Sequence, residues 1–230
     1  MLTTSLVHKF NISFRVIPVR EWSKEVLSNK LDILNLPRVQ GEIEVDLTVS
    51  KHLTGTFKTA HHGRLSSPVT GIPACFDQKI CVKQTYKLNA NGTKSRFRGD
   101  ADYEKIVQEI ICLDWATILL DLTYIFIEGA VVEHGEPPGG IPRLCFVRAM
   151  LAEGTPTVDP QEKKYFLIEE WMGDAAETFT KYINNGHPES CVQADAPAEA
   201  HQIAEFLCFV QHVQYNQTGG LAFTSDYQGL

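Results

Sequence analysis

Strict alternation of apolar and polar residues is the feature that most restricts how this chain can fold. In Glu42–Val49, every second residue is Ile, Val or Leu, and the residues between them are Glu, Asp or Thr. Gln78–Leu88 alternates in the same way, with apolar or aromatic residues at 80, 82 and 86. A period of two is typical of a half-buried antiparallel strand. With further strands expected over Asn11–Val19 and His52–Gly63, the first half predicts a mostly antiparallel sheet.

Helical periodicity is clearest over Asp102–Leu122, where apolar residues recur every three or four positions. Asp100 or Asp102 is expected to cap the start of this helix. The same spacing predicts a helix over Ala198–Tyr215, and a less regular pattern suggests one over Glu21–Leu34. The chain therefore has an α+β composition.

Short apolar runs in the second half predict further strands. They are bounded by turn residues, including the loop predicted over Glu133–Pro142, "EHGEPPGGIP". The runs are Thr123–Val132, Arg143–Leu151, Tyr165–Met172 and Leu221–Gly229.

Bulk composition excludes several classes of protein. The 21 basic and 28 acidic residues give a net charge of −7, which argues against nucleic acid or an anionic membrane as a partner. Six cysteines without a CxxC pair suggest reduced thiols, and we identify no signal peptide. No uninterrupted run reaches the roughly 18 apolar residues of a membrane span. We therefore expect an intracellular, cytoplasmic protein.

Two groups of polar residues are candidates for binding a metal ion or phosphate. Asp226 and Gln228 are oxygen donors two residues apart, followed by a glycine, which suits a hard cation such as Mg²⁺. Lys83 lies within a predicted strand, where it is either a solvated lysine or a cation fixed for phosphate binding. The neighbouring His61 and His62 point to opposite faces of a strand and are not expected to bind metal.

Four sequence words occur in an order that resembles the alpha-kinase family, the atypical protein kinases that include myosin heavy chain kinases, elongation factor 2 kinase and channel-kinases. The words are "FLIEEWM", "FTKYINN", "FVQHVQY" and "DYQG". Ile183 and Tyr227 depart from the family's usual Asn and Leu. The resemblance covers roughly Leu53 to the end. It implies a two-lobed kinase domain over 41–230 with a truncated C-lobe, after a poorly defined extension over 1–40.

The resemblance also implies roles for individual residues. Lys83 would hold the ATP phosphates, and Lys58 takes the place of an arginine in the family's Gly-Ser-x-Arg-x-Ala-Phe, although "GTFKTAHHG" also fits a plain hairpin strand. Glu169 matches the hinge glutamate, and the backbone from Glu170 to Met172 would bind adenine. Residues expected to contact ribose or phosphate are Lys181, Asn184 and Asn185, which could instead stabilise a turn. Asp226 and Gln228 would bind Mg²⁺.

A helix glutamate pairs with the strand lysine in kinases generally. Glu109 and Glu104 are available, and Glu109 is the better candidate because it borders the apolar face, although either could be a solvated helix residue. His212 corresponds to a zinc ligand of the family. We expect it to bind no zinc, because the other ligands have no counterpart in these 230 residues.

The implied activity is transfer of the γ-phosphate of ATP to Ser or Thr of a protein substrate, with Mg²⁺. The family's Thr-Asp-Pro word, which carries the catalytic aspartate, is absent from the sequence, so we expect ATP affinity to persist and transfer to be impaired. One alternative is a non-catalytic, kinase-derived protein-interaction module. Another is a small-molecule phosphotransferase, which would need a deep acceptor pocket.

Overall fold

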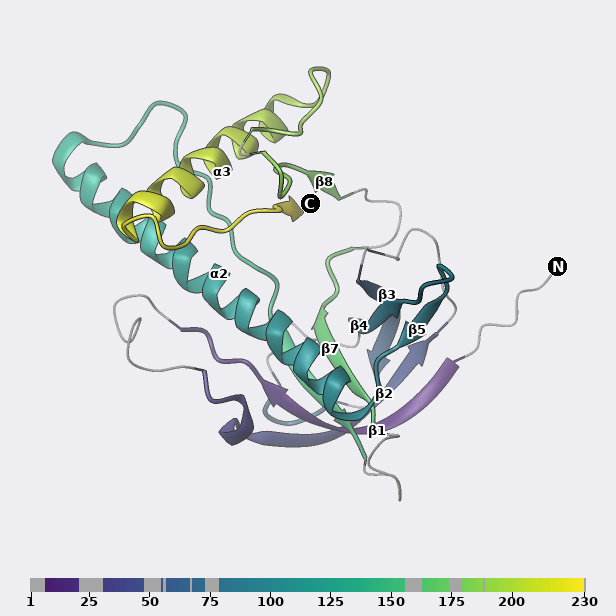
Figure 1. Ribbon diagram of the computed structural model, residues 1–230. Coiled ribbons are helices and arrows are strands. Elements are labelled where there is room, and N and C mark those ends of the chain that lie inside the picture. The colour runs from purple at the N-terminus through teal and green to yellow at the C-terminus, as the bar shows by residue number, and fades with distance from the viewer. Residues whose placement is uncertain are drawn as a thin grey trace. The chain divides into compact units, whose positions relative to one another are not determined.

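The computed structural model divides into two units (Figure 1). The first contains residues 1–18, 31–113 and 147–171, and the second contains 19–30, 114–146 and 172–230. The structure describes residues 7–20, 31–47, 55, 57–66, 68–72, 79–155, 163–173, 179–187 and 189–229.

The first unit is built on an antiparallel sheet that closes on itself. Its strands follow the order β3-β2-β1-β6-β7-β4-β5, and β3 also pairs with β4, so that six strands form a ring and β5 extends from it. The strands are β1 (Val7–Val16), β2 (Arg38–Asp46), β3 (Lys58–Leu65), β4 (Lys79–Leu88), β5 (Lys94–Arg96), β6 (Ala149–Gly154) and β7 (Tyr165–Glu170). All pairs are antiparallel, which confirms the predicted sheet type.

The interior of this ring is one apolar core to which all six strands contribute. The alternating residues of β2 and β4 supply Ile43, Val45, Ile80 and Val82, each with no exposed surface. Gly63 of β3 lies against this core, and a Cβ there would come within 2.7 Å of a Val82 methyl group. Closure of the sheet therefore requires a residue without a side chain at this position.

Helix α2 (Gly99–His134) is much longer than predicted. In its first half, Ile106 and Ile110 pack with Leu151 and Leu167 on the outer face of β6 and β7. The predicted strand over Thr123–Val132 is wrong, because this run continues α2. An apolar run without polar interruptions does not distinguish a buried strand from a buried helix. The helix ends at Gly135, which has a φ of 82° and donates its backbone N–H to Val131 O.

Other boundaries also differ from the predictions. In the segment predicted as a strand over Arg143–Leu151, regular pairing begins only at Ala149, and in Leu221–Gly229 only Gln228 and Gly229 form a strand, β9. Of the helix predicted over Glu21–Leu34, residues 21–30 lie outside the described part, and Ile33–Asn35 is a short 3-10 helix, η1.

The N-terminal segment is part of the sheet. Strand β1, from the region predicted as an extension over 1–40, pairs with both β2 and β6. A domain boundary after residue 40 would separate β1 from these partners.

The second unit contains α2 from Asp114 onward, α3 (Ala198–Gln217), and the short pair β8 (Thr180–Lys181) and β9 (Gln228–Gly229). Helix α3, confirmed nearly as predicted, packs on α2 through an apolar core (Figure 1). This core contains Leu120, Tyr182, Ile183, Ala204, Leu207, Val210 and Tyr227.

By length and mean hydropathy, α2 is also capable of crossing a membrane. A high mean hydropathy does not need an uninterrupted apolar run, so the absence of such a run from the sequence did not reveal this property. Ile106, Ile110 and Leu120 of α2 are buried in the two protein cores, whereas other large apolar residues of the same helix are exposed, namely Ile111, Trp115, Ile125, Phe126 and Val132.

The start of α2 is fixed by one buried carboxylate. Asp102, which is 1 % exposed, accepts hydrogen bonds from Thr85 Oγ1 at 2.7 Å, from the backbone N–H of Tyr165 at 3.2 Å and from Arg96 Nη2 at 3.3 Å. Arg96 also donates to Tyr165 O at 2.7 Å. The first turn of the helix is thereby attached to β4, β5 and β7.

Replacing Asp102 should therefore destabilise the protein strongly. Asp102→Ala leaves Arg96 without its carboxylate, and loss of one partner of a buried ion pair costs about 3–5 kcal/mol. The free energy of unfolding can be measured by urea denaturation. Asp100→Ala is the matched control, because Asp100 is exposed in the same turn and should contribute at most about 1 kcal/mol. Equal urea midpoints for the two variants would contradict this role of Asp102.

Candidate functional site

Three of the predicted residues share the outer face of the closed sheet. Lys83 on β4 lies opposite Ala60 of β3 and opposite Leu167 of β7. Lys58 and Glu169 are each two residues away from these partners, and residues two apart in a strand point to the same side. The register therefore places Lys58, Lys83 and Glu169 next to one another.

Lys83 forms an ion pair with Glu169. Its Nζ lies 2.5 Å from Glu169 Oε2, and the Glu169 side chain is only 7 % exposed. Burial by itself lowers the pKa of Lys83, but the negative charge of Glu169 and the hydrogen bond to it outweigh burial, so the pKa lies above its ordinary value. The ammonium of Lys83 is therefore charged at neutral pH.

The helix glutamate pairs with a different lysine from the one expected. Glu109 of α2 forms an ion pair with Lys58 Nζ, whereas Lys83 is paired with Glu169. Glu109 still acts on Lys83 at longer range, since its charge also raises the pKa of that lysine. We call Lys58, Lys83, Glu109 and Glu169 the four-charge cluster.

The two lysines of the four-charge cluster have the charge needed to bind an anion, but each of them is already paired with a carboxylate. The side chains of Lys58, Lys83 and Glu109 are 29 %, 27 % and 35 % exposed, so solvent reaches them. A polyphosphate could replace Glu109 and Glu169 as the partner of the two ammonium groups.

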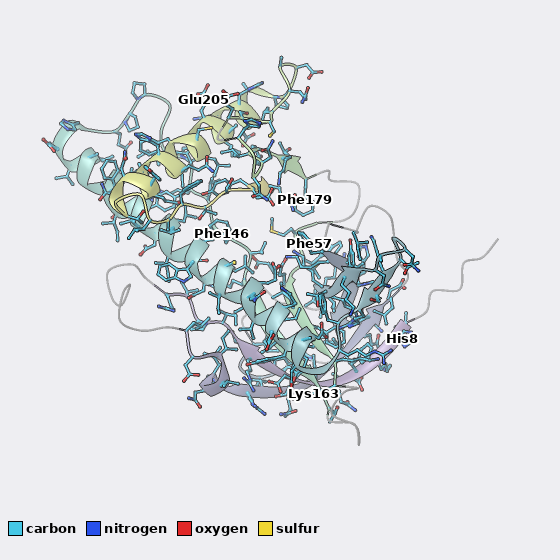
Figure 2. All side chains as sticks on the ribbon, in the orientation of Figure 1. His8, Phe57, Phe146, Lys163, Phe179 and Glu205 are labelled. Atoms are coloured by element: carbon cyan, nitrogen blue, oxygen red, sulfur yellow. The ribbon has the colours of Figure 1, made fainter. Side chains whose placement is uncertain are left out.

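Gly55 and Phe57 are the described residues immediately before β3, and Gly55 is hydrogen-bonded to this part of the sheet. The Gly55 N–H donates to Lys58 O at 2.9 Å, and its carbonyl accepts a hydrogen bond from the Tyr86 hydroxyl. Phe57, between them in sequence, is 70 % exposed (Figure 2). The backbone of Gly55 thus lies beside that of Lys58.

The predicted adenine-binding segment begins at the end of β7. Glu170 is held by Arg148: its N–H donates to Arg148 O at 3.3 Å, and its Oε1 accepts from Arg148 N at 3.2 Å. The next residue, Trp171, packs against His62 with ring centroids 4.2 Å apart. Met172 follows as a half-buried residue and belongs to the second unit.

In the second unit the predicted metal ligands lie beside a predicted phosphate ligand. Lys181 is opposite Gln228 in the β8–β9 pair and forms an ion pair with Asp226. Asp226 is a non-glycine residue with a φ of 66°, a conformation that normally costs energy and so suggests a functional constraint. Both Asp226 and Gln228 are exposed, and their oxygens fit a Mg²⁺ ion that keeps several water ligands. The described residues contain no cluster of three or more His, Cys, Asp or Glu that could hold a metal.

Of the remaining predicted residues, Asn184 and His212 contact groups nearby in the sequence. Asn184 Oδ1 accepts from the backbone N–H groups of Gly186 at 2.8 Å and His187 at 3.0 Å, so its side chain stabilises a turn. Asn185 is exposed. His212 Nε2 lies 3.0 Å from Asn216 Nδ2.

Sequence reasoning missed Cys81, which lies directly opposite Glu169 in the β4–β7 register. Burial, and then the charge of Glu169, raise the pKa of the Cys81 thiol to about 11. No local sequence signal marks it, because its environment comes from a strand far away in the chain.

The raised pKa predicts slow alkylation of Cys81. A rise from 9.0 to about 11 means about 100-fold less thiolate at neutral pH, and the thiolate is the nucleophile. Iodoacetamide labelling at pH 8, followed by mass spectrometry of each cysteine, should modify the exposed Cys112 and Cys145 long before Cys81. Glu169→Gln should accelerate Cys81 labelling. Labelling of Cys81 as fast as Cys112 in the unchanged protein would contradict this electrostatic environment.

Comparison with known proteins gives structural relatives only. The sequence matches no protein-family model and no curated protein. The structure is similar to the apoenzyme alpha-kinase domain of myosin-II heavy chain kinase A, with a TM-score of 0.50 and 14 % identity over 100 % of this chain and 81 % of that one. It is also similar to an inactive alpha-kinase domain of myosin heavy chain kinase A in complex with ATP, with a TM-score of 0.52 and 14 % identity over 96 % of this chain and 80 % of that one.

An alpha kinase from Entamoeba histolytica gives a TM-score of 0.54 and 13 % identity, over 98 % of this chain and 72 % of that chain. These matches cover both units, although the sequences have diverged widely. The chain therefore has the fold of an alpha-kinase domain, as its sequence words predict.

Proposed function

We propose that this chain is an ATP-binding domain of the alpha-kinase type, whose reaction is transfer of the γ-phosphate to Ser or Thr of a protein substrate. The observation that carries the proposal is the four-charge cluster. It puts two lysines from neighbouring strands on the outer face of a rigid closed sheet, with a charged Lys83. The ATP and AMPPCP complexes of the similar myosin heavy chain kinase A domains support the nucleotide as ligand.

The role of the lysines is charge neutralisation. Lys83 would bind α- or β-phosphate oxygens, and Lys58 would reach the phosphates from the adjacent strand. Glu169 and Glu109, displaced from the ammonium groups, would then be available to accept hydrogen bonds from other parts of the nucleotide. The backbone from Glu170 to Met172 would bind adenine, as the sequence resemblance implies.

Magnesium would be held in the second unit by Asp226 and Gln228. The cation supplies charge to the phosphates, and Lys181 would be released from Asp226 to bind phosphate oxygen. In the transfer itself, the substrate hydroxyl oxygen forms a bond to the γ-phosphorus, the bond from phosphorus to the bridging oxygen breaks, ADP leaves, and the hydroxyl proton passes to water. The residues proposed here position and neutralise the phosphates, and the group that orients the hydroxyl has no assigned residue among these 230.

A second candidate is a kinase-derived module that binds proteins and does not bind nucleotide. The observation that favours it is that three lysines expected to bind the nucleotide are already paired with carboxylates. Lys58 and Lys83 each have a carboxylate partner already, and Lys181 is paired with Asp226.

Thermal unfolding with Mg–ATP distinguishes these candidates. ATP at ten times its dissociation constant stabilises the folded state by about 1.4 kcal/mol, which raises the midpoint by roughly 3–6 °C for a chain of this size. Lys83→Met should abolish the shift. Lys87→Met is the matched control, because Lys87 is an exposed lysine of the same strand, and it should keep the shift. The midpoint of each variant without nucleotide shows whether it is folded.

The absence of any shift in the unchanged protein would favour the interaction module. An equal shift in Lys83→Met and Lys87→Met would remove Lys83 from the binding site. Release of ADP in the presence of a Ser/Thr-containing protein, measured in parallel, would report on transfer separately from binding.

A further inference from the structure

The second unit contains an apolar cavity that the nucleotide proposal does not use. Its volume is about 340 Å³, within the range of sites that bind organic ligands or side chains. It lies where the last turns of α2, the loop after α2 and helix α3 meet. Residues that line it include Phe126, Ala130, Val131, Pro137, Ile141 and Phe209.

The walls of the cavity are held in place by hydrogen bonds. Gln202 of α3 donates its side-chain N–H to Gly139 O at 3.2 Å, which ties the loop to α3. The Tyr124 hydroxyl donates to Pro142 O at 3.0 Å and accepts from Leu144 N at 2.7 Å, which ties the same loop to α2. The cavity is therefore formed before any ligand binds.

The lining leaves large apolar surfaces in water. Phe126 is 39 % exposed and Phe209 is 42 % exposed, on two different helices that face the same cavity. Covering the exposed part of such a side chain with an apolar group removes apolar surface from water, which is favourable. An apolar group that fills the cavity would therefore be stabilised by contacts on both helices.

Three acidic residues neighbour this apolar lining in the sequence. Glu133 and Glu136 lie next to the lining residues His134 and Pro137, and Glu205 precedes Phe206 on α3, four residues before Phe209 (Figure 2). All three side chains are exposed. Two basic residues of this region are themselves paired with acids: His134 lies 3.6 Å from Glu133, and Arg143 lies 4.0 Å from a further acid, Glu128. We call the cavity with Glu133, Glu136 and Glu205 the acidic-rimmed cavity.

We propose that the acidic-rimmed cavity is a docking site for a basic amphipathic helix of a partner protein, which inserts a Leu or Phe side chain into the cavity and places Lys or Arg against the rim. An apolar stripe with cations on either side matches the arrangement of lining and rim. An anionic membrane surface is disfavoured, because the rim carries the same sign of charge as its lipids. Docking of this kind is independent of nucleotide binding.

A direct binding experiment tests the proposal with the full chain and no nucleotide. The probe is a fluorescein-labelled peptide of about 14 residues, roughly four helical turns, with Leu on one face and Lys on the other. Fluorescence anisotropy should show saturable binding that weakens as salt is raised, because salt screens the rim. The same peptide with Glu in place of every Lys should bind at least about tenfold more weakly.

Two variants separate the apolar and the charged parts of the site. Ala130→Trp fills the cavity, and Glu133→Lys/Glu136→Lys/Glu205→Lys reverses the rim without altering buried residues. Each should weaken the Lys peptide at least about tenfold. The controls are Val132→Ser, which changes a residue of α2 that is 89 % exposed and does not line the cavity, and Glu104→Lys, which reverses an exposed acid in the first unit. Both controls should bind as the unchanged protein does.

Several results would overturn the proposal. The first is no saturable binding of the Lys peptide, and the second is equal binding of the Lys and Glu peptides. The third is an unchanged affinity of the triple charge variant for the Lys peptide. This variant tests the proposal even if Ala130→Trp does not fold. Co-flotation with anionic vesicles in place of peptide binding would indicate a membrane surface. Because no nucleotide is present, failure here leaves the Mg–ATP result unaffected.

Discussion

The buried carboxylate of Asp102 is the interaction on which the candidate site depends. It joins the first turn of α2 to three strands of the closed sheet through Thr85, Arg96 and the backbone of Tyr165. Glu109 lies seven residues further along, two helical turns away and on the same side. Fixing the helix at Asp102 therefore also fixes the place where Glu109 meets Lys58. A charge so deeply buried is tolerated because each partner is a hydrogen-bond donor.

The closed sheet supplies the rest of the geometry. Residues of one parity fill its interior, and residues of the other parity face outward, where register brings Lys58, Lys83 and Glu169 together. These charges would be costly if they were unpaired, since Glu169 is nearly buried. The four-charge cluster is thus neutral as a whole, and an anionic ligand has to compete with its own carboxylates. This competition favours a ligand with several negative charges, such as a triphosphate, over a single anion.

In the second unit, the predicted metal ligands and the apolar cavity lie outside the apolar core. Its core is formed by α2, α3 and the strand pair near the C-terminus, which leaves Asp226 and Gln228 on the surface. The same packing leaves an apolar cavity beyond the core, between the end of α2 and α3. The same packed unit therefore carries both the proposed ion site and the proposed docking surface.

The sequence by itself determined strands β2 and β4, which of their residues face the core, helix α3 and the alpha-kinase fold. Alternation in β2 and β4 is a local property, and the four sequence words carry the resemblance that the structural comparisons bear out as an alpha-kinase fold. Only the tertiary structure decided that Thr123–Val132 is helix, that Glu109 pairs with Lys58, and that Cys81 lies beside Glu169. An apolar run has no period that separates buried helix from buried strand, and ion pairing depends on the register between strands that are distant in sequence. Local pattern thus fixes which way a side chain points, whereas long-range pairing decides what it meets.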